Sequence, residues 1–261
     1  MLESLINFKL IQKKPYLIFV WAIIVASVSV ISSAHVQSLP SVSPGFFSVL
    51  LTIIPSAYFL TVLIRKEEKI EEKEIQKYHR KTFWGRHEKD IMILLFFFFG
   101  LAMAFGIWGF ALPDEFFDVQ LTKINQIRGG ITGAQTVALS TFDLIFRNNL
   151  QVTLLSFIFS FIFGAGAIFI IVWNASVLGV YIGELSKALW QIPIISLSFL
   201  PHGIPEIAGY IAAALAGGLL SAGILRKNTF RVLSIVAFDS AMLMVLAILL
   251  ILFGAGIEAF L

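Results

Sequence analysis

The stretch from Pro201 to Glu206 carries the side chains best suited to chemistry. It reads Pro-His-Gly-Ile-Pro-Glu, so an imidazole and a carboxylate lie four positions apart among residues that break helices. On a helical path His202 and Glu206 share one face, where they could bind a metal ion or relay a proton. The structural alternative is a bent helix that starts near Ile204, with Glu206 stabilised at the positive end of the helix dipole.

Catalytic sites of the common kinds find little support in the sequence. A catalytic zinc needs about three protein ligands, and His35 is the single further histidine that we expect near the same membrane face. The HExxH and GxSxG elements do not occur, and without cysteine there are no disulfides or thiolate sites. We therefore predict no catalytic residue, no metal and no cofactor, and an intramembrane metalloprotease is the least favoured alternative.

Other ionisable residues lie within apolar stretches. Glu184 and Lys187 have the spacing of a pair on one helix face, and Asp239 lies in a later apolar stretch. Charged groups are costly in a bilayer and often belong to ion or proton pathways. Transport through a cavity lined by these carboxylates is therefore an alternative to purely structural pairing.

The elements that must position these residues are membrane-spanning helices. The chain is 58% hydrophobic and 13% charged, about half the charged share of a soluble domain. Its apolar windows predict an all-α, polytopic transmembrane helical bundle with seven spans, at 15–34, 45–64, 91–112, 149–173, 175–199, 204–225 and 231–253. Six spans are the alternative, with a re-entrant segment near 175–199, because Gly183 and Pro193 interrupt that window.

The first apolar stretch could also be a cleavable signal peptide, since lysines precede it and Ser32-Ser33-Ala34 follow it. The stretch from Tyr16 to Ile31 is long for such a peptide, however. An uncleaved first span is the interpretation that we favour.

The distribution of cations predicts the orientation in the membrane. Fifteen of the 19 Lys and Arg residues fall at the N-terminus, in 65–90 and in 226–231. Cations near span ends are retained in the cytoplasm, so we place the N-terminus inside and, by parity, the C-terminus outside. This gives a multi-pass protein of the cell (cytoplasmic) membrane. The pI of about 9.1 reflects these loops, and we expect no nucleic acid partner.

Three regions follow from this reading: an N-terminal two-helix hairpin at 1–64, a charged cytoplasmic loop at 65–90, and a five-span core at 91–261. The charges of the loop have the spacing of a solvated helix. Hydrophobic residues recur between 113 and 149 in a way that suits amphipathic segments at the outer interface, broken near Gly129-Gly130 and Gly133.

Small residues recur every fourth position in the sixth predicted span. They are Gly209, Ala213, Gly217 and Ser221. Such a stripe lets another helix approach closely, so we expect it to be buried against a helix of this chain or of a neighbour. We expect the buried polar residues to gather at the outer end of the same span.

Several motifs together resemble the stage II sporulation protein M family. They are Arg147-Asn148-Asn149, the Gly164/Gly166 span that ends in Trp173-Asn174, Gly179, and the PHGxxE element from Pro201 to Glu206. The resemblance covers roughly residues 91–253, and the PHGxxE element is its most specific part. It implies functional roles for Asn148, Asn149, Asn174, Gly179, His202, Gly203 and Glu206.

The resemblance implies an anchoring role and not catalysis. The family's namesake looks like a membrane scaffold that holds peptidoglycan-degrading enzymes at the engulfing septum of spore-forming bacteria. Relatives also occur in organisms that make no spores, and residues 1–90 lie outside the resemblance, so we expect a relative that acts outside sporulation. We predict a membrane scaffold or accessory protein that binds the lipid bilayer and other membrane or envelope proteins, with a homo-oligomer as an open alternative. A secondary transporter or channel is the second hypothesis.

Overall fold

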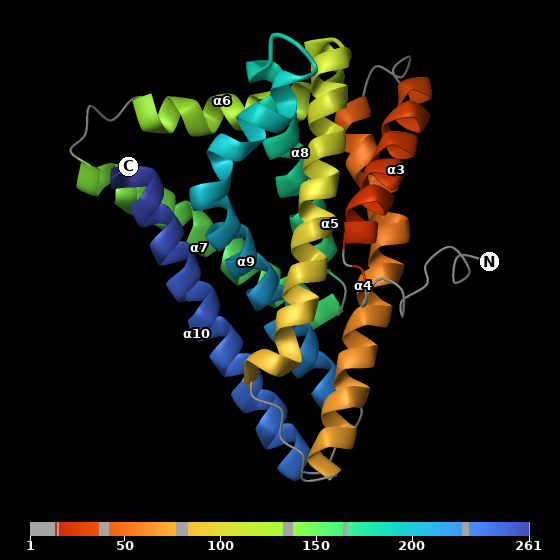
Figure 1. Ribbon diagram of the computed structural model, residues 1–261, viewed down its shortest axis with the longest axis vertical. Coiled ribbons are helices and arrows are strands. Elements are labelled where there is room, and N and C mark those ends of the chain that lie inside the picture. Colours follow the sequence, from red (N-terminus) through yellow and green to blue (C-terminus); the bar gives the residue numbers. More distant parts are fainter. Residues whose placement is uncertain are drawn as a thin grey trace.

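Helices make up every regular element of the part of the chain that is described here. The structure is a computed structural model that describes residues 14, 16–36, 42–76, 83–132, 138–163, 166–225 and 230–260. Its elements, shown in Figure 1, are α3 (Tyr16–Ser33), η1 (Ala34–Val36), α4 (Pro44–Gln76), α5 (Phe83–Ala111), η2 (Asp114–Phe117), α6 (Asp118–Thr132), α7 (Ala138–Phe163), α8 (Ala167–Leu185), α9 (Gln191–Leu225) and α10 (Phe230–Phe260). The predicted all-α fold is confirmed.

Membrane-spanning helices dominate this architecture. Within the described ranges, six helices are long and apolar enough to cross a bilayer: α3, α5, α7, α8, α9 and α10. A shorter apolar helix, Pro44–Tyr58, forms the first part of α4. The protein is therefore a multi-pass membrane protein. Six described helices are long enough to span the bilayer, so the seven-span prediction depends on whether the shorter apolar part of α4 also crosses it.

The charged loop begins as a helix. α4 continues without interruption from its apolar part to Gln76, well into the basic and acidic stretch. The spacing of opposite charges predicts such a helical extension. Residues 77–82 lie outside the described part of the chain.

The predicted boundary between the fourth and fifth spans is wrong. α7 ends at Phe163 and α8 begins at Ala167, whereas the sequence predicts one span through 149–173. Gly166 forms the turn, and its carbonyl accepts a hydrogen bond of 3.2 Å from the Phe169 amide. Hydropathy missed this break because apolar residues continue on both sides of it. Asn174 consequently lies within α8 and not at the end of a span.

α9 is one helix of 35 residues, although the sequence predicts a break near residue 200. Pro201 and Pro205 both lie inside it. The window 175–199 is divided between the end of α8 and the start of α9, so it forms neither a single span nor a re-entrant segment. In hydrocarbon a free backbone end has no water to bind, so a proline-containing helix is less costly than an open loop.

The helix ends lie at two opposite ends of the bundle. In Figure 1 the end of α4, the start of α5, the end of α9 and the start of α10 gather at the bottom, while α6 lies across the top. The helix ends that flank the basic segments 65–90 and 226–231 thus lie at the same end of the molecule. This arrangement agrees with a common cytoplasmic location, which remains a prediction from the charges.

α6 is the amphipathic segment that the sequence predicts, but it is shorter than expected. It occupies Asp118–Thr132 and lies across the top of the bundle in Figure 1, whereas residues 138–149 already belong to α7. The preceding turn buries Phe116 and Phe117 in the core. The Gln120 amide donates a hydrogen bond of 3.0 Å to the Gly45 carbonyl and so connects α6 to the start of α4.

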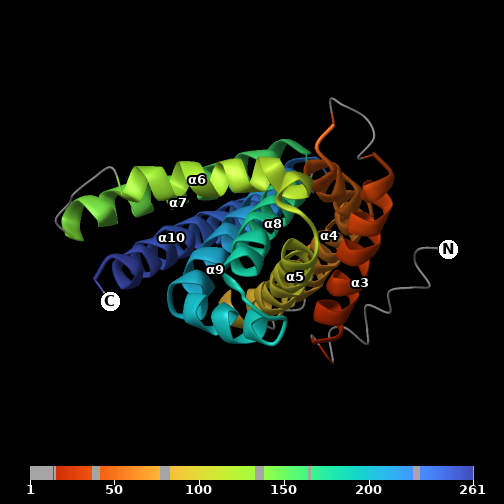
Figure 2. The same ribbon diagram turned by 90° about the horizontal axis from the view of Figure 1, so that it is seen from above.

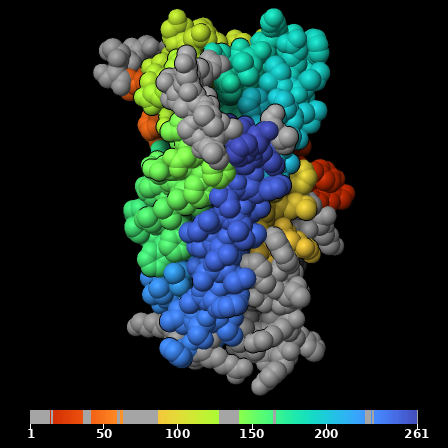
Figure 3. Space-filling view, turned by 90° about the vertical axis from the view of Figure 1, so that its left-hand side faces the viewer, coloured from red at the N-terminus to blue at the C-terminus, as the bar shows by residue number. Residues whose placement is uncertain are grey.

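The surface along α7 and α10 has the character of a lipid-facing wall. Figure 3 shows the two helices side by side over much of one face. Large apolar side chains are exposed along both, among them Leu154, Ile158 and Ile162 on α7 and Val245, Leu249 and Phe253 on α10. Hydrocarbon around the protein would solvate these side chains.

The small-residue stripe of α9 is buried, as the sequence predicts. A Cβ atom on Gly209 would lie 2.7 Å from Ile251 of α10, and one on Gly217 would collide with the Phe157 carbonyl of α7. Ala213 has no exposed surface. The stripe therefore faces two helices of the same chain, α10 and α7. Figure 2 shows α9 beside α10 and α8.

A second glycine contact joins α5 and α8. A Cβ atom on Gly183 would lie 2.6 Å from the Gly106 carbonyl oxygen. A Cβ atom on Gly179 would collide with the Ala102 carbonyl oxygen. Small residues at such spacing let helix backbones pack tightly in membranes. Gly179, which the family resemblance singles out, thus has a packing role.

Candidate functional site: a polar cluster between α7, α9 and α10

Asn149 on α7 lies at the centre of a buried polar cluster. Its amide oxygen accepts a hydrogen bond of 2.6 Å from the Tyr210 hydroxyl on α9. The Asn149 side chain also hydrogen-bonds the carboxylate of Glu206, one helical turn earlier on α9. Because a carboxylate only accepts, the Asn149 amide nitrogen is the donor in this second bond. One amide thus connects α7 to two side chains of α9.

Gly254 brings α10 against the same cluster. A Cβ atom on this residue would lie 2.5 Å from Cγ of Glu206 and 3.0 Å from the His202 carbonyl oxygen. The Glu206 side chain therefore occupies the space that a larger residue would take. Sequence reasoning missed Gly254, because a glycine near the end of an apolar helix carries no distinctive signal.

Glu258 adds a second carboxylate to the cluster. It lies one turn beyond Gly254 on the same face of α10, and it interacts electrostatically with both Glu206 and His202. Glu258 is exposed, whereas Oε1 of Glu206 is shielded and accepts no hydrogen bond from the described residues. The site thus combines a shielded carboxylate with an accessible one.

The helical geometry of His202 and Glu206 is confirmed, but the predicted cap is wrong. Both residues lie inside α9, and Glu206 comes fifteen residues after Gln191, where this helix begins. Free backbone N–H groups occur only in the first turn of a helix, so they cannot bind this carboxylate. Its partner is instead the Asn149 amide.

His202 packs against aromatic residues as well as facing the carboxylates. Its ring meets the Phe199 ring edge to face, with centroids 5.9 Å apart. Phe199 contacts Tyr181 of α8 in the same manner at 5.6 Å. Gly203 does not take part in these contacts. It lines an apolar pocket between α3, α5, α8 and α9.

Three other predicted site residues lie outside this network or at its edge. Asn148 is exposed, with its amide nitrogen 3.5 Å from the Asn149 amide oxygen. Asn174 lies on α8 and donates a hydrogen bond of 2.7 Å to the Ile170 carbonyl of its own helix. Glu184 is exposed at the end of α8, and Lys187 lies in the turn that follows. The last two residues therefore mark a helix end and not the middle of a span.

A second buried cluster joins α5 and α10 at the opposite end of the bundle. Nε2 of His87 lies 3.9 Å from Oδ2 of Asp239, and both side chains are 2% exposed. Asp90, one turn after His87, is equally buried. The sequence places His87 in the charged loop at 65–90, whereas the structure buries its side chain against α10 at the start of the apolar span His87–Ala111. The sequence feature that indicated a buried polar contact is the position of Asp239 in an apolar stretch, because a charged side chain is costly in a bilayer.

The chemistry open to these clusters is hydrogen bonding and charge pairing. In the ranges that the structure describes, no three His, Asp or Glu side chains gather closely enough to hold a metal ion. The site residues instead connect helices: α7 with α9, α9 with α10, and α5 with α10. This fold and these clusters define a polytopic helical membrane protein held together by buried polar contacts.

The chain belongs to the stage II sporulation protein M family. The model of this family matches residues 94–261, which include Asn149, Glu206, Tyr210 and Gly254. α3 and α4 precede the matched region.

One relative is an archaeal protein. An uncharacterized protein of Methanocaldococcus jannaschii is 36% identical over 76 residues, which cover 29% of this chain and 43% of that protein. The match thus spans less than half of the relative's length. No solved structure is significantly similar to the chain.

Proposed function

We propose that this protein is a scaffold of the cell membrane that holds another membrane or envelope protein in place. The observation that carries the proposal is how the buried polar groups are used. Asn149 bonds Tyr210 and Glu206, and His87 faces Asp239, so these groups connect one helix to another. Such contacts favour one fixed arrangement of helices, as a platform for a partner requires.

A surface beside α6 is suited to a polar partner. A groove of about 290 Å³ lies between α6 and α8, lined by Asp118, Val119, Thr122, Lys123, Gln126 and Trp173. Both charge signs and an aromatic ring are present, a combination that suits recognition of a protein segment. The groove is at the end of the bundle where we place the outside of the cell.

Photo-crosslinking in living cells tests this proposal. A photoreactive amino acid at Gln126 should form adducts with one or a few specific proteins, because this exposed position lines the α6 groove. The control is the same amino acid at Leu249, which is 57% exposed on the lipid-facing side of α10. Equal protein adducts at both positions, or none at Gln126, would count against a scaffold.

Proton-coupled transport is the second candidate. It is favoured by Glu206, whose Oε1 atom is shielded from solvent and lies near a second carboxylate, Glu258. Carboxylates inside membrane segments commonly serve proton or ion movement. A transporter predicts flux through the purified protein, and Glu206→Gln should abolish it while the fold is kept.

A further inference from the structure

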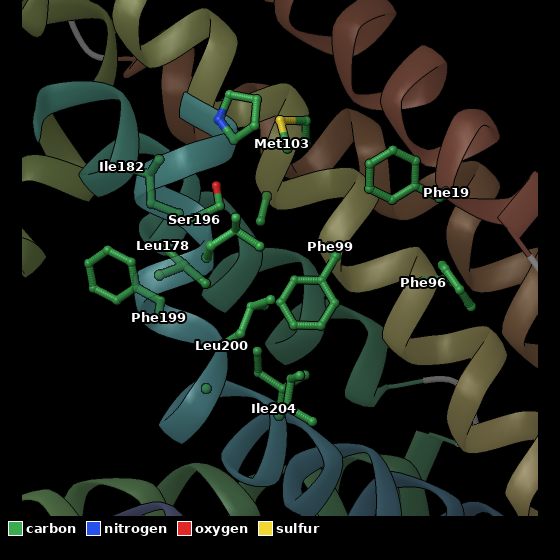
Figure 4. Close-up of a pocket in the computed structure, with 15 residues that line it drawn as sticks. Phe19, Phe96, Phe99, Met103, Leu178, Ile182, Ser196, Phe199, Leu200 and Ile204 are labelled. Atoms are coloured by element: carbon green, nitrogen blue, oxygen red, sulfur yellow. The ribbon is translucent and has the colours of Figure 1, made fainter. Parts of the chain in front are cut away.

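An apolar pocket opens between α3, α5, α8 and α9. It has a volume of about 400 Å³, within the size range of sites for small molecules. Figure 4 shows Phe96, Phe99 and Met103 on the α5 side, with Phe199, Leu200 and Ile204 of α9 on the other. Ser196 is the one residue with a polar side chain among those that line it.

The pocket faces hydrocarbon. All of its walls belong to helices that can cross the bilayer. Residues at its edge are open to the surroundings, with exposed fractions of 61% for Leu197, 41% for Ile204 and 36% for Phe96. Water would find almost no hydrogen-bonding partners there, so the occupant has to be apolar.

The pocket is long enough for the hydrocarbon chain of one leaflet. On α9 it runs from Pro193 to Ile207, which at 1.5 Å per residue is a rise of about 21 Å. Half of the hydrocarbon core is about 15 Å thick. The cavity therefore starts near the membrane surface at the α6 end and reaches past the depth of one hydrocarbon chain.

The turn above the pocket carries groups that suit a phospholipid headgroup. Lys187 is exposed in this turn, and Trp190, 66% exposed, directly precedes α9. Tryptophan is enriched at the level of headgroups, and an ammonium is complementary to a phosphate.

We propose that this pocket binds one hydrocarbon chain of a phospholipid from the leaflet at the α6 end, with the lipid phosphate beside Lys187. The lipid would fill the space between α9 and the α3/α5 pair as a structural ligand. This inference is independent of whether the protein acts as a scaffold or as a transporter.

A photoactivatable phospholipid tests the proposal. The purified protein is placed in nanodiscs of phosphatidylethanolamine and phosphatidylglycerol with a trace of phosphatidylcholine carrying a diazirine in one acyl chain. After irradiation, mass spectrometry should find the label concentrated on residues 193–207 and 96–103. Even labelling of all spans would indicate ordinary surrounding lipid and would overturn the proposal.

Gly203 offers a variant that fills the pocket. A Cβ atom there would meet only Ile207, at 3.9 Å, so Gly203→Leu can fold while its side chain enters the cavity. Labelling of the pocket should fall about tenfold, since the excluded methylene groups each contribute to lipid binding. Gly256→Leu is the matched control, because a Cβ atom on Gly256 meets nothing within 4 Å, and it should leave labelling unchanged. Pocket labelling that persists in a folded Gly203→Leu protein would contradict lipid binding.

A lipid competition and a cysteine crosslink distinguish a specific lipid site from other occupants. In detergent, labelling of the parent pocket should fall as unlabelled phospholipid is added, and Lys187→Gln should weaken this competition. Labelling that unlabelled phospholipid does not reduce would refute a specific site even if Gly203→Leu fails to fold. The chain contains no cysteine, so Leu197→Cys provides a unique crosslinking point in native membranes. A polypeptide crosslinked there at high yield would assign the pocket to a partner helix and overturn the proposal.

Discussion

At the scale of single residues, Asn149 and Glu206 give the site its character. A buried amide that accepts from Tyr210 and donates to Glu206 is satisfied on both sides. Hydrogen bonds between membrane helices contribute about 0.6 to 2 kcal/mol each. The two bonds are therefore a substantial part of the affinity between α7 and α9, and they can be tested one atom at a time.

Substitution of Glu206 separates its hydrogen bond from its charge. In Glu206→Gln the side-chain oxygen can still accept from Asn149, so we expect a loss of about 1 kcal/mol or less in the free energy of unfolding. Glu206→Leu leaves the Asn149 donor unpaired and should cost about 1 to 3 kcal/mol. Thermal unfolding in detergent measures both. Equal stability of the two variants would mean that the Asn149 bond contributes nothing.

Gly254→Ala tests the contact between Glu206 and α10. The added methyl group would lie 2.5 Å from Glu206 Cγ, so we expect a destabilisation of about 1 to 3 kcal/mol. Combining it with Glu206→Ala should recover part of that loss, although the His202 carbonyl remains 3.0 Å away. Gly256→Ala, where there is open space, is the control. A strictly additive double mutant would show that the two side chains do not meet.

At the scale of elements, the central position of α9 explains why its sequence is so rich in small residues. From Ile207 to Leu219 every residue of this helix is buried. Gly209 approaches α10 and Gly217 approaches α7, so a single stripe serves two interfaces on adjoining faces. The sequence could predict that the stripe packs but not how many partners it has.

Gly217→Leu should disrupt the α7–α9 interface. The Gly217 Cα lies so close to the Phe157 backbone that no side chain fits without a shift of the helix. Ala213→Leu introduces bulk into a fully buried site, and we expect both variants to lose at least about 1 to 3 kcal/mol. The melting temperature in detergent provides the measurement, with Gly256→Leu as the control. Unchanged melting of both α9 variants would place this stripe in lipid.

The sequence predicted helices well and their ends less well. The apolar window 15–34 locates α3 closely, whereas the windows 91–112 and 231–253 miss the start of α5 and the end of α10, because both helices continue past their apolar parts into charged residues. Between 149 and 199 the chain is apolar across two helix ends, so hydropathy alone could not find the turns at Gly166 and near Lys187. Pro201 was interpreted as a break because proline ends helices in water, whereas a bilayer penalises the open backbone more.

The candidate site was also predicted only in part. His202 and Glu206 were found because ionisable groups among helix breakers are unusual in a membrane protein. Tyr210 and Gly254 were missed because an aromatic residue and a glycine are common in such helices. Only the packing of α7 and α10 against α9 makes them part of the site.

At the scale of the whole molecule, the arrangement of helices is consistent with the topology that the charge distribution predicts. The helix ends that flank both basic segments lie together, and α6 lies at the other end (Figure 1). Because the chain has no cysteine, single cysteines report sidedness cleanly.

A membrane-impermeant maleimide should label Asn125→Cys in intact cells but not Glu72→Cys, since positive charges hold the 65–90 region inside. Asn125 is exposed on α6. Permeabilised cells, in which both positions should react, provide the control. A C-terminal tag should be cut by external protease; a protected tag would rule out seven spans with the N-terminus inside.

The central claim is that the buried carboxylates hold helices together in a scaffold and do not conduct protons. The most direct measurement is proton flux into liposomes that contain the purified protein and a pH-sensitive dye, under an imposed pH gradient and membrane potential. We predict that the parent and Glu206→Gln proteins both give the leak of protein-free liposomes. Flux in the parent that Glu206→Gln abolishes, with the variant still folded, would contradict the scaffold and establish transport.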